Sequence, residues 1–195
     1  MKYIKIKGNL IHKTAILNWS KIIIGKGNII GPYVVIGNYA QHPQSDSIGK
    51  IIIGNKNTFN EFCNIHLPTK IKKKTSIGNN NYFMNSTTID HDCTIENNIV
   101  LSSNVVLGGN VYIMNGAQLG MKVCVHQNQI IGSYSMIGMN SFITRKLKVV
   151  PGYKFYGKPA IKKKLNLIGL KRNKINKDML QIENSRYKKL SVLDK

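Results

Sequence analysis

The two side chains best suited to chemistry in this sequence are His91 and Asp92, which are neighbours in the chain. An imidazole beside a carboxylate can act as a general base, because the carboxylate orients the ring and leaves one ring nitrogen to accept a proton. The same histidine could equally bind a metal or serve as a hydrogen-bonded structural residue. The choice depends on the elements that position this pair.

A six-residue repeat of apolar residues runs through the sequence on both sides of the pair. From Ile77 to Ile143 an apolar residue recurs at every sixth position, and four residues after each of them stands a mostly small residue. Neither the 3.6-residue period of an α-helix nor simple alternation gives a period of six, whereas a coil of three short strands with tight corners does. We therefore predict an all-β solenoid, a parallel β-helix, over residues 22–148, with a less regular coil before it.

Small residues in the repeat have two expected places. Glycine and asparagine follow many of the aliphatic positions, as at Gly78, Gly108 and Asn97, and both tolerate the unusual dihedral angles of a tight corner. Cys63 and Cys93 fall on positions of small core residues and are predicted to be buried. The three cysteines are an odd number and contain no Cys-x-x-Cys pair, so neither a disulfide framework nor a zinc site is predicted.

The repeat also predicts which residues meet across successive coils. Three hexads make one coil, so residues eighteen apart are expected to stack at about 4.8 Å, the spacing between strands. Gly109 is then predicted to lie over His91. By the same rule His126 lies over Gly108, which lies over Asp90, and His91, Gly109 and His126 are predicted to share one corner column. A glycine here leaves its backbone N–H unobstructed, as a developing oxyanion requires.

Zinc binding is the main competing interpretation of these histidines. Zinc hydratases built on a β-helix also place histidines on successive coils, and they usually need a third histidine near the second. No histidine follows closely after His126, and the others lie far back in the chain, at His12, His42 and His66. A three-histidine zinc site is therefore not predicted, and no metal ligand is assigned.

Two segments break the six-residue phase, and the repeat ends before the chain does. Residues 41–51 and residues 66–76 are expected to project as loops, which either shape a binding surface or are solvated excursions without a task. After residue 151 the repeat stops, residues 156–160 indicate an exit turn, and a helix capped by Asn176 is expected to pack on its own coil or on a neighbouring subunit. The predicted domains are a β-helix over 1–150 and a short C-terminal helical extension over 151–195.

The chain is strongly basic, with 29 Lys and Arg against 8 Asp and Glu and a formal net charge of +21. This charge would attract nucleic acid, anionic lipid or an acidic protein, unless it reflects only codon bias. The densest basic runs contain no interleaved aromatic residues, so nucleic-acid binding is the weaker interpretation and is not predicted; these runs are residues 70–74, 162–164 and 171–174. Without an uninterrupted apolar leader or a run long enough to span a bilayer, no transmembrane segment is expected and the predicted location is cytoplasmic.

Four segments of the sequence carry a more specific signal than the repeat. They are residues 88–111 with His91-Asp92-Cys93-Thr94, the triplet Val125-His126-Gln127, Pro43-Gln44 with Asp46, and residues 165–172 with Asn166 and Arg172. In their order along the chain they resemble the UDP-N-acetylglucosamine O-acyltransferases that begin lipid A synthesis. The resemblance covers most of the chain, whereas the hexads alone are typical of the whole acyltransferase superfamily.

This resemblance implies a left-handed parallel β-helix that forms a homotrimer with active sites between subunits. His91 would remove the proton from the sugar 3-hydroxyl of UDP-N-acetylglucosamine, and that oxygen would attack the thioester of a hydroxyacyl chain on acyl carrier protein, without a covalent enzyme intermediate. The donor chain is carried on the phosphopantetheine of the carrier, so no other cofactor is expected. Asp92 would orient His91, and Gly109 would donate its N–H to the thioester oxygen. The implied substrate-binding residues are Gln44, Asp46, His126, Gln127, Met139, Asn166 and Arg172.

The sequence departs from the family pattern at a few positions. Thr88 and Asn110 stand where the family usually has two further active-site histidines, and Ser47-Ile48 replaces a Lys-Tyr pair. Met139 holds a position where side-chain bulk limits acyl length, so a shorter chain than glycine would admit is predicted. Two alternatives remain, namely an acetyl-CoA-dependent nucleotide-sugar acetyltransferase with the same base and a non-catalytic trimeric paralogue.

Overall fold

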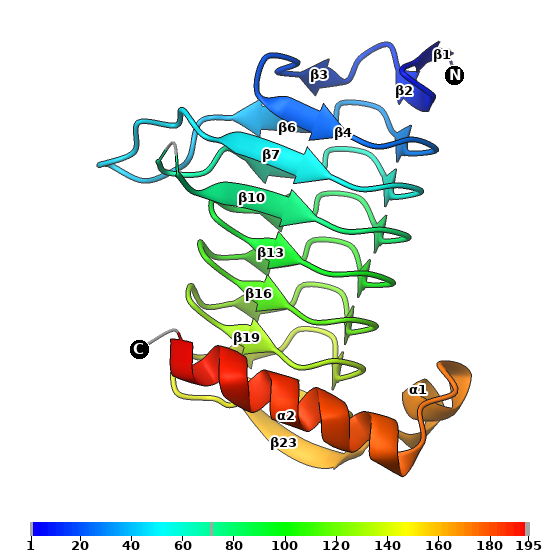
Figure 1. The fold of residues 1–195 in the computed structure, drawn as a ribbon, viewed down its shortest axis with the longest axis vertical. Helices are drawn as coiled ribbons and strands as arrows, with labels where there is room; N and C mark the ends of the chain where they lie inside the picture. Colours follow the sequence, from blue (N-terminus) through cyan, green and yellow to red (C-terminus); the bar gives the residue numbers. More distant parts are fainter. Residues whose placement is uncertain (1, 71, 194–195) are drawn as a thin grey trace.

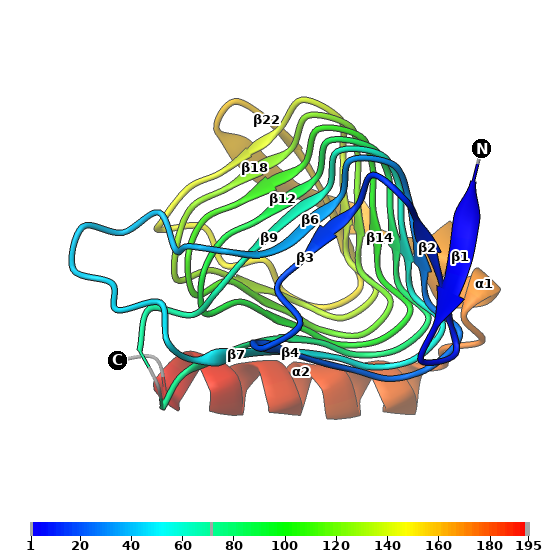
Figure 2. The same ribbon diagram turned by 90° about the horizontal axis from the view of Figure 1, so that it is seen from above.

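The chain folds into a β-helix of triangular cross-section, with three sheets wrapped around an apolar interior (Figure 1, Figure 2). The computed structural model describes residues 2–70 and 72–193. Seen from the N-terminal end, the chain runs counter-clockwise as it recedes, so the coil is left-handed (Figure 2). The predicted fold class is confirmed.

Each face of the prism is one sheet, and neighbouring coils pair in parallel. Sheet A contains, in spatial order, β1 (Tyr3–Ile6), β2 (Asn9–His12), β5 (Ile29–Ile30), β8 (Thr58–Phe59), β11 (Tyr82–Phe83), β14 (Val100–Leu101), β17 (Gln118–Leu119), β20 (Met136–Ile137), β22 (Tyr153–Gly157) and β23 (Ala160–Leu165). Sheet B contains β3 (Ile16–Leu17), β6 (Val35–Asn38), β9 (Asn64–His66), β12 (Thr88–Ile89), β15 (Val106–Leu107), β18 (Cys124–Val125) and β21 (Phe142–Ile143). Sheet C contains β4 (Ile22–Ile24), β7 (Lys50–Ile53), β10 (Lys74–Ile77), β13 (Thr94–Ile95), β16 (Tyr112–Ile113) and β19 (Ile130–Ile131).

The hexad positions form the core. The aliphatic residues from Ile77 to Ile143 are all buried, and they stack on their counterparts eighteen residues on, as Leu107 does on Val125. Cys63 and Cys93 are buried among them, as predicted. Burial raises the pKa of both thiols to about 12, because a thiolate would lose its solvation there. Neither cysteine is therefore available as a nucleophile.

The corners use small residues in two different ways, and the sequence-based expectation was partly wrong. From Ile77 to Ile137, the residue three after each apolar hexad position has a left-handed backbone, with φ near 60° at Asp92, Asn98 and Asn110. Gly78 and Gly108, directly after the aliphatic residue, do not have positive φ. They are small because the next coil passes close by: a Cβ on Gly78 would lie 2.6 Å from the carbonyl oxygen of Glu96.

The C-terminal part extends the solenoid further than predicted. Phe155 in β22 pairs with Ile137 of β20, so the stacking continues past the boundary at residue 150. Strand β23 then turns back antiparallel to β22, at the turn predicted for residues 156–160. Two helices follow where one was expected, α1 (Leu167–Arg172) and α2 (Lys177–Leu193).

Helix α2 packs across sheet C of its own chain (Figure 2). Asn176 caps it by accepting a hydrogen bond from the Met179 N–H at 2.8 Å, as predicted. Tyr187 buries its ring against Met114 and Ile130. In the described residues, neither helix combines the length and the apolarity that crossing a bilayer requires.

Candidate active site

The candidate site lies at the corner where the chain passes from sheet B to sheet C. Because Ile89, Leu107 and Val125 pair in register, the second residue after each forms one column at this corner: His91, Gly109 and Gln127. The predicted place of Gly109 over His91 is confirmed. The predicted place of His126 in the same column was wrong, because eighteen residues after Gly109 stands Gln127.

His91 and Asp92 form a directed pair at this corner. The Nδ1 atom of His91 lies 2.9 Å from Oδ2 of Asp92, and the side chains are 12% and 4% exposed. An ionised carboxylate can only accept a hydrogen bond, so the proton of a neutral His91 ring sits on Nδ1. Its Nε2 is then free to accept a proton, as general base catalysis requires.

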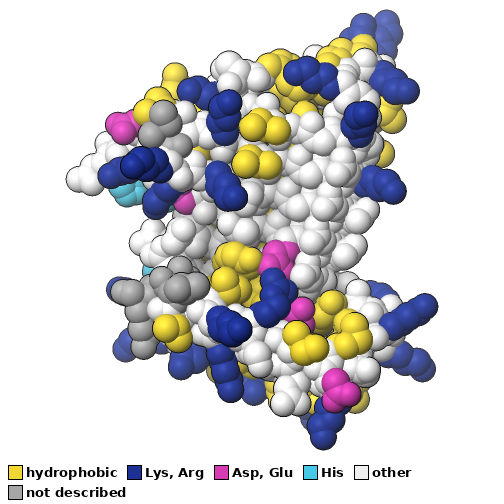
Figure 3. Space-filling model, in the orientation of Figure 1, with side chains coloured by type: hydrophobic (Ala, Val, Ile, Leu, Met, Phe, Trp, Pro, Cys, Tyr) yellow, Lys and Arg dark blue, Asp and Glu magenta, His cyan; other side chains and the backbone are white. Residues whose placement is uncertain are grey.

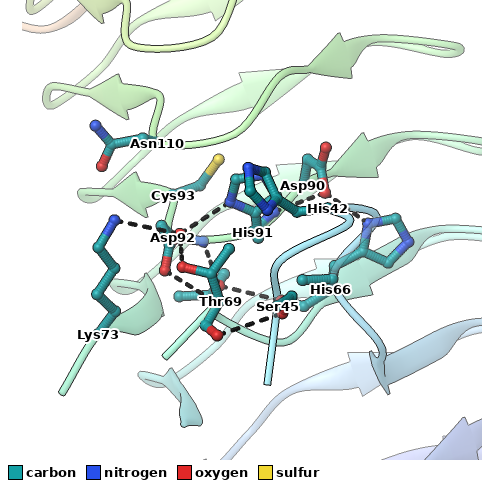
Figure 4. Close-up of polar contacts among 12 residues, drawn as sticks. His42, Ser45, His66, Thr69, Lys73, Asp90, His91, Asp92, Cys93 and Asn110 are labelled. Carbon is teal, nitrogen blue, oxygen red and sulfur yellow. Dashed lines mark hydrogen bonds and ion pairs between the residues drawn. The ribbon is translucent and has the colours of Figure 1, made fainter. Parts of the chain in front are cut away.

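Asp92 is held by a second set of donors (Figure 4). Thr69 donates its backbone N–H to one carboxylate oxygen at 3.1 Å and its hydroxyl to the other at 2.8 Å. The Lys73 ammonium lies 3.6 Å from Oδ2. Burial alone would raise the pKa of Asp92, but the hydrogen bonds from His91 and Thr69 outweigh it and lower the pKa below its ordinary value. The carboxylate is thus ionised at neutral pH.

Acid should weaken the fold through Asp92. Its pKa is lower in the folded protein than in the unfolded chain, where it is about 3.9. The stability that this difference supplies is complete above roughly pH 4 and is lost as the pH falls through the lower folded value. We expect the urea midpoint of the wild type to fall as the pH drops below about 4, and that of Asp92→Asn to fall less. Asp46 is exposed, so Asp46→Asn serves as the control and should decline as the wild type does. An equal decline in the wild type and in Asp92→Asn would contradict this assignment.

Gly109 fits against the face of the imidazole. A Cβ at this position would lie 2.5 Å from His91 Nε2 and 2.8 Å from Nδ1, so any larger residue would displace the ring. Within the described residues the Gly109 N–H has no hydrogen-bond acceptor, although its carbonyl accepts from the Asn128 N–H at 2.9 Å. A free backbone donor beside a histidine base is the arrangement that stabilises a developing oxyanion.

Both phase-breaking segments form walls of a cleft over this corner. The cleft has a volume of about 320 Å³. The first loop contributes His42, whose ring meets that of His91 edge to face at 5.5 Å. The loops overhang a hollowed edge of the molecule, and lysine side chains gather on them (Figure 3). The residues that line the cleft are His42, Gln44, Thr69, Lys70, Lys73, His91, Asp92, Gly109, Asn110, Gln127 and Asn128.

Sequence reasoning missed two histidines near the site. His42 contacts the His91 ring, and His66 Nδ1 lies 2.9 Å from Oδ1 of Asp90. Both lie far from His91 in the chain and were not predicted to be near it. The break in the six-residue phase indicates a longer coil, which brings His66 to this corner. Phe59 pairs with Phe83, so one coil here spans twenty-four residues, and the same step takes His66 to Asp90.

The other predicted substrate contacts are spread over the molecule. Gln44 and Gln127 line the cleft. Asp46 is exposed on the first loop, and its N–H donates to the Thr69 carbonyl at 3.0 Å. His126 is exposed, and its Nδ1 lies 2.8 Å from the Gln127 carbonyl oxygen. Neither Asp46 nor His126 lines the cleft.

Three further predicted contacts lie away from the cleft. Met139 stands at the corner between sheets A and B and is 67% exposed. Asn166 and Arg172 line a separate groove of about 140 Å³ over sheet A, on the side of the prism opposite the cleft. Asn166 is buried, caps α1 through the Gly169 N–H and donates to the Tyr134 carbonyl. On a single chain these residues cannot reach His91.

The two positions that depart from the family pattern hold neutral side chains. Thr88 is half-buried in β12, and Asn110 donates to Oδ1 of Asn128 at 2.8 Å beside the cleft. Within residues 2–70 and 72–193, no three His, Cys, Asp or Glu side chains are arranged to hold a metal ion.

Comparison with known proteins identifies relatives by sequence, although no family model matches the chain. An acyl-[acyl-carrier-protein]–UDP-N-acetylglucosamine O-acyltransferase from Burkholderia orbicola is 34% identical over 169 residues, which are 86% of this chain and 64% of that protein. The protein of the same name from Gloeothece citriformis is 35% identical over 154 residues, 78% of this chain and 55% of that protein. The chain thus spans less than two thirds of the length of these relatives.

Solved structures give the same result. The UDP-N-acetylglucosamine acyltransferase from Bacteroides fragilis matches with a TM-score of 0.82 at 26% identity, over 92% of this chain and 70% of that one. Sequence and fold therefore point to one group of relatives.

Proposed function

Because the chain belongs to the UDP-N-acetylglucosamine O-acyltransferase family, we propose that it transfers a hydroxyacyl group to the 3-hydroxyl of UDP-N-acetylglucosamine. The donor is a thioester on acyl carrier protein, and the reaction would be the first step of lipid A synthesis. The observation that carries the proposal is the hydrogen bond from His91 Nδ1 to Asp92. This pair lies in a cleft, and Gly109 of the following coil lies against the His91 ring.

In the proposed reaction His91 is the general base. Its Nε2 takes the proton of the sugar hydroxyl while that oxygen attacks the thioester carbonyl carbon. Asp92 stabilises the imidazolium that forms, and the Gly109 N–H donates to the carbonyl oxygen as it gains negative charge. When the carbon–sulfur bond breaks, the proton passes from His91 to the leaving sulfur. The ester product and free thiol leave the enzyme unchanged, without a covalent intermediate.

We further propose that the complete site forms between subunits of a homotrimer. Gln44 and Gln127 border the base, whereas Asn166 and Arg172 lie in a groove on the opposite side of the same chain. A neighbouring subunit that presents its groove to this cleft would bring the two sets together. Arg172 could then pair with a phosphate through two parallel N–H donors, and Met139 would shorten the acyl pocket.

Charge supports the proposed donor. Acyl carrier protein is acidic, and a net charge of +21 favours its encounter with this chain. Lys70 and Lys73 bring part of this charge to the cleft itself. The donor's own phosphopantetheine supplies the thioester, so the reaction needs no resident cofactor.

A paired assay tests the proposal. Purified protein is incubated with UDP-N-acetylglucosamine and either hydroxyacyl carrier protein or acetyl-CoA, and O-acylated sugar nucleotide is measured by mass spectrometry. We expect product with the carrier-bound donor and at least 100-fold less with acetyl-CoA. The reverse preference would indicate the acetyltransferase alternative. Thr88 and Asn110, which replace two histidines of the family pattern, are the reason to test for a non-catalytic paralogue. A folded trimer that is inactive with both donors would indicate such a paralogue.

A further inference from the structure

A second carboxylate contacts His91 from its other side and has no part in the reaction described above. Oδ1 of Asp90 accepts the backbone N–H of His91 at 2.8 Å. The same oxygen lies 2.9 Å from Nδ1 of His66, a residue supplied by the preceding coil (Figure 4). Asp90 therefore ties the corner that bears His91 to strand β9 of the preceding coil.

The polar contact of the His66 ring is the one to Asp90. His66 is 1% exposed, and its Nε2 is buried without a hydrogen-bond partner among the described residues. A proton on Nε2 would be left without an acceptor, so the ring proton belongs on Nδ1, facing the carboxylate. Burial alone would raise the pKa of Asp90, but hydrogen bonds from His66 and the His91 N–H outweigh it and lower the pKa. The acceptor is thus charged and fixed.

The two carboxylates act on different parts of the same residue. Asp92 fixes the ring of His91, while Asp90 fixes its backbone, and the His91 carbonyl accepts the Asn110 N–H at 2.8 Å. The next residue, Asp92, has a left-handed backbone with φ of 61°. A corner in this conformation is held by its surroundings rather than by its own preference. Loss of the Asp90 contact would let the base shift.

We infer that Asp90, oriented by His66, is a positioning residue that fixes the backbone of His91 and so keeps the imidazole in reacting position. The catalytic part of this inference rests on the proposed function, while the backbone part does not. A shift of about 1 Å in a reacting group can lower a rate by about 100-fold. Asp90 would therefore influence turnover without touching substrate.

The first experiment measures the His91 amide directly, by hydrogen exchange with NMR detection, and needs no activity. In Asp90→Ala we expect the His91 amide to exchange at least 10-fold faster than in the wild type. Asp90→Asn keeps an oxygen that can accept both hydrogen bonds, so its exchange should stay within about threefold. Unchanged exchange in Asp90→Ala would overturn the inference, whether or not the protein is an acyltransferase.

The second experiment measures turnover in the same variants, well below their unfolding temperatures. We expect kcat of Asp90→Ala to fall about 30-fold with KM within twofold, and Asp90→Asn to recover most of the loss. Faster amide exchange with an unchanged kcat would overturn the catalytic part. If the wild type transfers no acyl group to the sugar nucleotide, the proposed function fails, and amide exchange alone decides whether Asp90 holds His91.

A variant pair at His66 covers the case in which Asp90→Ala does not fold. His66→Asn can place an amide donor near the position of Nδ1, whereas His66→Ala removes the donor. We expect His66→Ala to increase His91 amide exchange and lower kcat, and His66→Asn to restore both in part. Equal behaviour of the two His66 variants would contradict the role of His66.

Discussion

Replacing His91 with alanine should reduce kcat by roughly 1,000-fold with little change in KM. A positioned general base contributes about 10²- to 10⁴-fold to a rate. Among the described residues that line the cleft, the other histidine is His42, whose ring meets His91 edge to face and whose Nδ1 accepts the Gln44 N–H. The measurement is steady-state transfer to UDP-N-acetylglucosamine from hydroxyacyl carrier protein.

The matched control is His12→Ala, another histidine removal at the far N-terminal end of the solenoid. His12 lies in β2, and its Nδ1 contacts the Thr14 hydroxyl at 2.8 Å. We expect this variant to retain wild-type turnover. Activity of His91→Ala within tenfold of the control would exclude His91 as the base.

Replacing Gly109 with alanine should reduce kcat/KM by about 100-fold. The added Cβ would lie 2.5 Å from His91 Nε2, about 1 Å inside ordinary van der Waals contact, so the ring or the corner must move. Gly109 does not have positive φ, so the effect is steric rather than conformational. Overpacking of this kind costs about 1–3 kcal/mol, and we expect a lower thermal midpoint as well.

A double variant separates this clash from other effects of the methyl group. In His91→Ala the ring is gone, so adding Gly109→Ala should leave the thermal midpoint unchanged, whereas it should lower the midpoint in the wild type. Equal destabilisation in both backgrounds would show that the Cβ strikes something other than His91. The cycle uses unfolding alone and is independent of activity.

The fold was predictable from the sequence because the core demands it at every coil. Ile95 must stack on Ile113, and Leu101 on Leu119, so each coil repeats the same apolar pattern at a fixed step. That step also placed Gly109 on His91 correctly. The same step places His126 over Gly108, so His126 lies one residue away from the column of His91 and Gly109, which continues to Gln127.

The walls of the site were not predictable in the same way. The phase-breaking segments 41–51 and 66–76 interrupt the repeat, so no periodicity predicts where their side chains lie. Thr69 reaches Asp92, and His42 reaches His91, because hydrogen bonds fold these loops back over the corner, among them the Ala40 N–H to the Ser47 hydroxyl at 3.0 Å. Such contacts depend on backbone paths that only three-dimensional packing fixes.

By itself, then, the sequence determined the solenoid, the pairing of His91 with Asp92 and the glycine stacked on that histidine, since a repeating core turns distance along the chain into distance in space. Only the tertiary structure decided that His66 holds Asp90, that Lys73 approaches Asp92, and that Asn166 and Arg172 lie across the prism from the base. The physical reason is that residues outside the repeat are placed by hydrogen bonds and packing between distant segments, which no local pattern records.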